Sequence, residues 1–249
     1  MLTLVPITRG EEPPPLEWRP AIKPEVKQLE DGRLDVGGVI VDPDRRTATL
    51  PVRLNQSNDG EQIEYLLVHE NGKTHESLLK TSIQPFHLHT AMLLLGVSRA
   101  AAQHAVAPPE NIDDEYLALA PSPLGPGVSI AIIAGEERIP VETWVWDEAR
   151  QSAMLPANWV YTGSYFQGVN FIAEVDGSFA SLITDPASLI NSGDPRRTVD
   201  DNWYINAQAS SLPKADETVL LEIALLPEPV DASADALKLS PEKLTHPAQ

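Results

Sequence analysis

The chain contains no cysteine in its 249 residues. This absence excludes thiolate nucleophiles, zinc sites built from cysteine, cysteine-held iron–sulfur clusters and disulfide bonds. It does not exclude an oxidising compartment, because a chain of this length can bury a full core that needs no disulfides. The lack of cysteine therefore limits the chemistry and leaves the cellular location open.

Basic residues are also scarce: 18 Lys and Arg stand against 36 Asp and Glu, which gives a formal net charge of −18. A charge of this sign repels phosphate backbones and anionic lipid surfaces, so we expect no nucleic acid among the partners. No apolar run is long enough to cross a bilayer, and we expect no membrane span. The opening stretch MLTLVPITRG has too few apolar residues for a signal peptide and leaves open whether one was removed.

Three segments differ in composition. Residues 1–25 include the proline-rich stretch GEEPPPLEWRPAIKP and are predicted to be a disordered leader. Residues 227–249 hold few large apolar groups and are predicted to be a disordered tail. The domain between them, residues 26–226, is interrupted by a stretch rich in helix and strand breakers at 108–127. It is therefore expected either as one body or as two lobes that meet near residue 120.

The first half of this domain shows β-type patterns followed by a helix. Two β-type runs flank the turn at residues 43–46 and predict a hairpin, and Gly37-Gly38 inside the first run predicts a bulge. A further strand over 63–69 precedes Asn71-Gly72, a strong signal for a second hairpin. Pro85 then begins a predicted helix that ends at Gly96.

The second half is dominated by alternating apolar and polar residues. A short helical turn is predicted over 185–191. Strands are predicted over 128–135, 137–147, 158–166, 170–177, 178–185 and 218–227. The expected fold class is α+β, with a mostly antiparallel sheet and one principal helix.

Several quoted stretches carry a family resemblance. EYLLVHENGKTHESLLKT, followed by a proline and the apolar helix HTAMLLLG, resembles the signature of the YdjY-like family of bacterial proteins. WVYTGSYF and GSFASLITDPASLIN resemble the extended, secreted form of planctomycete type. The resemblance covers residues 30–225, and Gly72 to Ser77 is its most specific part. It implies a periplasmic or secreted protein and names no reaction; the ferredoxin-like label of some members does not transfer to a chain without cysteine.

The specific part of this signature is also the first candidate site. If residues 73–79 form the second arm of a hairpin, Lys73, His75 and Ser77 share one face, and Glu76 lies on the other. Alternatively, Thr74 caps a short helical turn that begins at His75. The sequence leaves both alternatives open, and with them the choice between a structural turn and a ligand-binding motif made of Lys73, His75, Glu76 and Ser77.

Four of the six histidines fall between residues 69 and 89, which raises the question of a metal site. The candidate ligands are His69, His75, Glu76 and His87, because imidazole and carboxylate groups that converge across a hairpin hold zinc. His87 and His89 are poor joint ligands, since two residues of helix place side chains about 200° apart. His75 and Ser77 are likewise too far apart along a strand for direct nucleophile activation.

Aromatic residues are few but concentrated in the second half. Exposed aromatic rings on a sheet bind sugars or peptides, whereas buried ones fill the core. Strand alternation predicts that Trp144 and Trp146 share a face. The aromatic residues concerned are Trp144, Trp146, Trp159, Trp203 and Tyr204.

These observations favour a non-catalytic binding or interaction module without a cofactor. Its expected partner is a protein, an envelope component or a small ligand. The alternative is a metal-dependent enzyme centred on His75 and Glu76.

Overall fold

A computed structural model describes residues 21–55, 61–97, 123–157, 159–198, 200–214 and 217–227. The leader, apart from residues 21–25, the tail beyond Pro227 and the lobe boundary near residue 120 lie outside these ranges. No helix in the described ranges is long and apolar enough to cross a bilayer.

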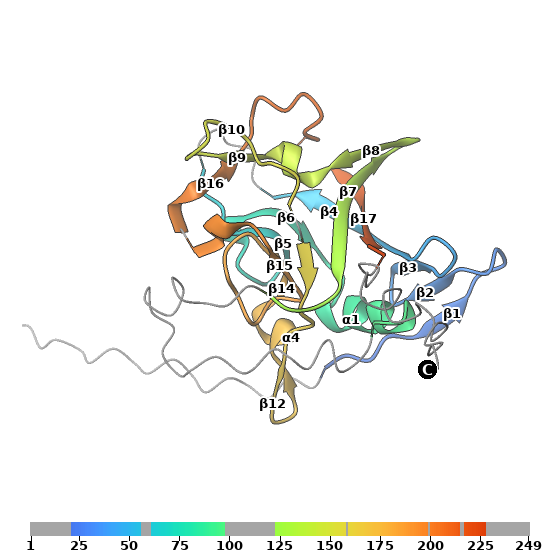
Figure 1. The fold of residues 1–249 in the computed structure, drawn as a ribbon. Coiled ribbons are helices and arrows are strands. Elements are labelled where there is room, and N and C mark those ends of the chain that lie inside the picture. Colours follow the sequence, from blue (N-terminus) through green and yellow to red (C-terminus); the bar gives the residue numbers. More distant parts are fainter. Residues whose placement is uncertain are drawn as a thin grey trace, which may run out of the picture.

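The main sheet closes into a barrel of eight strands (Figure 1). Closure comes from β4, whose Arg53 and Leu54 pair with Lys80 and Leu79 of β6. In spatial order the strands are β4 (Thr47–Leu54), β17 (Thr218–Leu225), β7 (Gly127–Ala134), β11 (Trp159–Tyr161), β15 (Ile190–Ser192), β14 (Ser178–Ser181), β5 (Tyr65–His69) and β6 (Ser77–Thr81).

The predicted α+β class with an antiparallel sheet is wrong. The described chain is mostly β, and its barrel is mixed, because β14 pairs with β15 and β5 with β6 in parallel. Asn71-Gly72 therefore does not close a hairpin. Residues 70–76 instead carry the chain back along β5, since seven residues span up to about 25 Å and a five-residue strand rises only about 16 Å.

Further strands extend the barrel. The antiparallel strands β1 (Val26–Gln28), β2 (Leu34–Val36) and β3 (Val39–Asp42) continue the sheet from β4, and β8 (Glu137–Pro140) pairs with β7. The hairpin at residues 43–46 is confirmed, since Asp42 pairs with Thr47. The predicted bulge at Gly37-Gly38 is instead a tight turn between β2 and β3, with φ angles of 59° and 94° that favour glycine.

Two α-helices occur in the described ranges. The predicted helix is confirmed as α1 (Pro85–Leu94), which starts with proline and packs against β2, β3 and β4. The predicted strand over 170–177 is wrong beyond Phe171, because α4 (Ile172–Asp176) follows and ends at Gly177 in the left-handed region. The predicted helical turn over 185–191 is also wrong, since a turn there leads directly into β15.

Smaller elements surround the barrel. Figure 1 shows a three-stranded sheet at the top and α1 and α4 at the bottom. The sheet contains β10 (Ser152–Ala153), β9 (Val145–Asp147) and β16 (Trp203–Ile205), and β12 (Phe166–Gln167) pairs with β13 (Asn170–Phe171). The 3-10 turns are η1 (Thr74–Glu76), η2 (Val141–Trp144), η3 (Pro195–Thr198) and η4 (Asp200–Asn202).

One apolar core connects these elements. Leu50 and Leu67, from the first half of the chain, belong to the same buried cluster as Trp159 and Ile223 from the second half. Both halves also supply strands to the barrel wall. The fold therefore depends on contacts between segments far apart in the sequence.

Candidate functional site

The predicted motif from Lys73 to Ser77 lies between two parallel strands. Thr74 to Glu76 form the 3-10 turn η1, so the strand-face arrangement predicted for Lys73, His75 and Ser77 is wrong. The helical-turn alternative is closer to the structure, although Lys73 occupies the N-cap position and no side chain caps the turn. This local structure separates the four predicted side chains.

The side chains of His75, Glu76 and Ser77 face different surroundings. His75 is 80% exposed, and its Nε2 lies 3.7 Å from Glu76 Oε2. Ser77 is buried and donates a hydrogen bond from Oγ to the Leu79 carbonyl oxygen at 2.7 Å. The structure therefore does not bring these residues together around one cavity.

Lys73 has a buried partner instead. Its Nζ donates to the Tyr65 hydroxyl at 2.5 Å and lies 4.6 Å from the centre of that ring. The Tyr65 hydroxyl in turn donates to Asp185 Oδ2 at 3.0 Å. Burial, and then the negative charge of Asp185, raise the pKa of Tyr65 above its usual value of 10, so the phenol stays neutral and links the two charged groups.

The glycine of the motif also has a packing role. A Cβ at Gly72 would lie 2.9 Å from the Asp176 carbonyl oxygen and 3.3 Å from the Gly177 Cα. The backbone at Gly72 therefore packs directly against the end of α4, which leaves no room for a side chain. Together with the Lys73 contact, this packing explains the Gly-Lys pair as a structural junction.

The histidines do not form the predicted metal site within the described part of the chain. His69 is buried: its Nδ1 accepts from the Asn71 N–H at 3.1 Å, and burial lowers its pKa. His87 Nδ1 lies 3.0 Å from the Gly37 carbonyl oxygen, whereas His75 points to solvent. Among the described residues, no three His, Cys, Asp or Glu side chains come together as metal ligands.

Most of the tryptophans fill the core. Trp144, Trp159 and Trp203 are almost completely buried, whereas Trp146 is only half-buried. The prediction that Trp144 and Trp146 share a strand face is wrong. Trp144 belongs to η2 and is buried in the core, whereas Trp146 belongs to β9. The Trp144 indole Nε1 donates to Ser211 Oγ at 2.9 Å.

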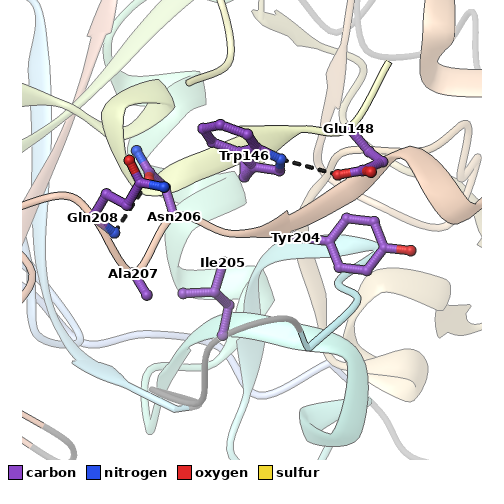
Figure 2. Close-up of a pocket in the computed structure, with 7 residues that line it drawn as sticks. All are labelled: Trp146, Glu148, Tyr204, Ile205, Asn206, Ala207 and Gln208. Carbon is purple, nitrogen blue, oxygen red and sulfur yellow. Dashed lines mark hydrogen bonds between the residues drawn. The ribbon is translucent and has the colours of Figure 1, made fainter. Parts of the chain in front are cut away.

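Trp146 and Tyr204 line a pocket on the three-stranded sheet (Figure 2). Tyr204 of β16 pairs directly with Trp146 of β9 in an antiparallel register. Residues in such a pair stand side by side on one face of the sheet. The pocket has a volume of about 430 Å³ and is lined by Trp146, Glu148, Tyr204, Ile205, Asn206, Ala207 and Gln208.

Several polar groups of the pocket are already engaged by the protein. The Trp146 Nε1 donates to Glu148 Oε2 at 3.0 Å. Asn206 Nδ2 donates to the Thr143 carbonyl oxygen at 2.7 Å, and its Oδ1 accepts from the Gln208 N–H at 3.3 Å. The Tyr204 hydroxyl and the Gln208 side-chain amide have no partner in the described part of the chain and remain available to a ligand.

A buried carboxylate supports the sheet from its other face. Asp147, between Trp146 and Glu148, is fully buried and accepts from Arg196 Nη1 and from Asn202 Nδ2. The Arg196 guanidinium also lies 5.3 Å from the centre of the Trp203 ring. This network fixes β9 against β16 and thereby holds the two pocket aromatics in place.

Sequence reasoning singled out Trp146 and Tyr204 but missed their pairing. It also missed Glu148, Asn206 and Gln208. The available signal was the alternation in WVWDE and WYINAQ, which places Trp146 with Glu148 and Tyr204 with Asn206. Alternation within a strand does not reveal which distant strand lies beside it.

Comparison of the chain with family models, with curated proteins and with solved structures found no match. The YdjY-like resemblance thus stays a prediction carried by the residues quoted for it.

Proposed function

We propose that the protein is a non-catalytic binding module whose ligand occupies the pocket between β9 and β16. The observation that carries this proposal is the cross-strand pair Trp146 and Tyr204, which lines a pocket of about 430 Å³. Such a volume lies within the range of small-ligand sites in proteins. Aromatic rings at a pocket wall provide apolar contact area at a low cost in side-chain entropy.

The chemistry of the lining supports binding rather than catalysis. Glu148 is the one acidic side chain of the pocket wall, and the wall has no histidine, lysine or serine. Histidine, lysine, serine and cysteine are the side chains that most often act as general bases or nucleophiles, and none of them lines the pocket. The wall instead combines aromatic surface with amides, a typical composition for recognition.

A periplasmic or secreted location is part of the same proposal. It rests on the YdjY-like resemblance of Gly72 to Ser77. A partner protein, an envelope component or a small ligand is then the expected occupant of the pocket.

The proposal is tested by ligand-observed NMR with a panel of neutral disaccharides and blocked amino acids. The double variant Trp146→Ala, Tyr204→Ala removes both rings, and Phe166→Ala serves as a control because Phe166 is an exposed aromatic residue on a different pair of strands. We expect at least one compound to bind the wild type and the control but not the double variant. Binding that is unchanged in a folded double variant, or no binding by any compound, would overturn the proposal.

A further inference from the structure

We infer that the pocket takes a cationic side chain, a lysine or arginine presented by a partner protein. This inference rests on the proposed function and specifies the chemistry of its ligand. Three features of the pocket carry it: a carboxylate without an ion-pair partner, two aromatic rings, and a wall in which the indole and Asn206 amide donors are already engaged.

The carboxylate of Glu148 is held in place without a cationic partner. Oε2 accepts from the Trp146 indole, which fixes the carboxylate at the edge of that ring. No ion pair joins Glu148 to a basic side chain in the described part of the chain. The neighbouring guanidinium groups of Arg150 and Arg196 bind Asp147 on the opposite face of β9. The second oxygen of Glu148 is thus open to a positively charged group.

Both aromatic rings line the same pocket. Trp146 and Tyr204 stand on adjacent strands but make no ring contact with each other. Figure 2 shows the indole and the phenol on the two neighbouring strands, with Glu148 beside the indole N–H. The face of an aromatic ring carries partial negative charge and attracts ammonium and guanidinium groups, and a nearby carboxylate strengthens this attraction.

The remaining polar groups of the pocket favour a ligand that donates hydrogen bonds and accepts none. The indole N–H is engaged by Glu148, and the amide N–H of Asn206 is engaged by the Thr143 carbonyl oxygen. A sugar needs donors as well as acceptors, and among the lining side chains only the Tyr204 hydroxyl and the Gln208 amide are free to donate. A lysine or arginine head is a donor with no acceptor and therefore matches the free oxygen of Glu148.

The charge of the whole chain favours the same class of partner. A net charge of −18 attracts basic proteins over a Debye length and raises their rate of association. An anionic peptide or polysaccharide would be repelled. A lysine or arginine on a basic partner protein therefore matches both the charge of the pocket and the net charge of the chain.

The test follows the indole N–H signal of Trp146 in ¹⁵N-labelled full-length protein, assigned with Trp146→Phe. The cationic probes are Nα-acetyl-lysine methylamide and Nα-acetyl-arginine methylamide. The neutral probes are the norleucine and citrulline analogues and the disaccharides maltose and cellobiose. We expect saturable shifts with the two cationic probes, and affinity at least about fivefold weaker for the neutral analogues.

A charge variant makes the test specific. Glu148→Gln should weaken binding of the cationic probes by about fivefold or more, and so should a rise in salt from about 50 mM to about 500 mM. Glu137→Gln removes one exposed carboxylate of β8, away from the pocket wall, and should leave the affinity unchanged. Equal binding by Glu148→Gln and wild type would overturn the inference.

The remaining outcomes separate the two proposals. If only the disaccharides or the neutral analogues shift the Trp146 signal, the cationic inference is wrong and the binding pocket stands. If no probe shifts the signal at any concentration up to about 50 mM, both proposals fail.

Discussion

Tyr65 makes two hydrogen bonds in the barrel wall that phenylalanine could not make. Its hydroxyl accepts from Lys73 and donates to Asp185, and the side chain is almost completely buried. Tyr65→Phe leaves both charged groups without this partner, and we expect it to lower the free energy of unfolding by about 1–3 kcal/mol. Urea denaturation at neutral pH measures this loss.

The matched control is Tyr204→Phe, which removes a hydroxyl without a partner in the described chain. Its effect on the free energy of unfolding should stay below about 0.5 kcal/mol. Equal losses for the two variants would show that the link from Lys73 through Tyr65 to Asp185 does not stabilise the fold.

Glu174 of α4 is a partly buried carboxylate that contacts the first turn of α1. Its Oε2 accepts from the Phe86 N–H at 2.9 Å, while Oε1 is buried without a partner among the described residues. Burial raises the pKa of Glu174 above its usual value of 4.5, because the charged form loses hydration. Between the unfolded and the folded pKa the native state binds more protons, so this group adds stability as the pH falls.

Glu174→Gln tests this linkage, because the amide keeps the acceptor for Phe86 and has no charge. We expect the stability of the variant relative to wild type to be greatest near pH 7 and to decrease as the pH falls to about 4.5. Thermal melts across this range measure the difference. A difference that is constant with pH would contradict the assigned role of burial.

At the scale of elements, the end of α4 meets the turn after β5. Gly177 has a φ of 71°, and a Cβ added to it would lie 3.0 Å from the Gly72 Cα. Gly135, in the turn between β7 and β8, has a similar φ of 65° but no atom within 4 Å of such a Cβ. The two glycines share the left-handed conformation and differ in packing.

Alanine at each position should therefore separate the cost of the left-handed backbone from the cost of steric crowding. Gly135→Ala should lose about 1–2 kcal/mol of unfolding free energy from the left-handed backbone alone. Gly177→Ala should lose a further 1–3 kcal/mol or so, because the methyl group forces two backbone segments apart. Chemical denaturation of both variants measures the difference, and a loss at Gly177 no larger than at Gly135 would contradict the close approach.

At the scale of the whole molecule, the barrel requires strands from both ends of the domain. The strand β17 lies between β4 and β7 and pairs with both along most of its length. A chain that ends at Lys214 lacks β17 and leaves β4 and β7 without their shared neighbour. We expect this truncated chain to show no cooperative thermal transition, because the barrel cannot close.

The control for this truncation ends at Pro227 and keeps every described strand. Its melting temperature should remain within about 5 °C of the full-length chain, as the composition of the tail predicts. A cooperative transition in the chain that ends at Lys214 would show that the barrel tolerates an open wall.

The sequence by itself determined the elements whose signals are local. Pro85 and Gly96 bracket α1 as predicted, the turn at 43–46 closes a hairpin, and the apolar run of β17 forms a strand. Each of these depends on neighbours within one or two turns of chain, which periodicity and turn chemistry reveal. The exclusion of disulfide bonds and of cysteine chemistry, and the strongly negative net charge, likewise follow from composition alone.

Only the tertiary structure decided the parallel pairing of β5 with β6, the closure of β4 on β6, and the meeting of Trp146 with Tyr204. The Asn-Gly signal favoured a hairpin, but the chain after β5 returns to pair in parallel as β6. Along this connection Gly72 packs against the end of α4, and Lys73 donates to Tyr65. Residues 146 and 204 are 58 positions apart in the sequence. A pocket between them exists because two distant strands pair, and pairing over such a separation follows from the burial of the whole core rather than from any local pattern.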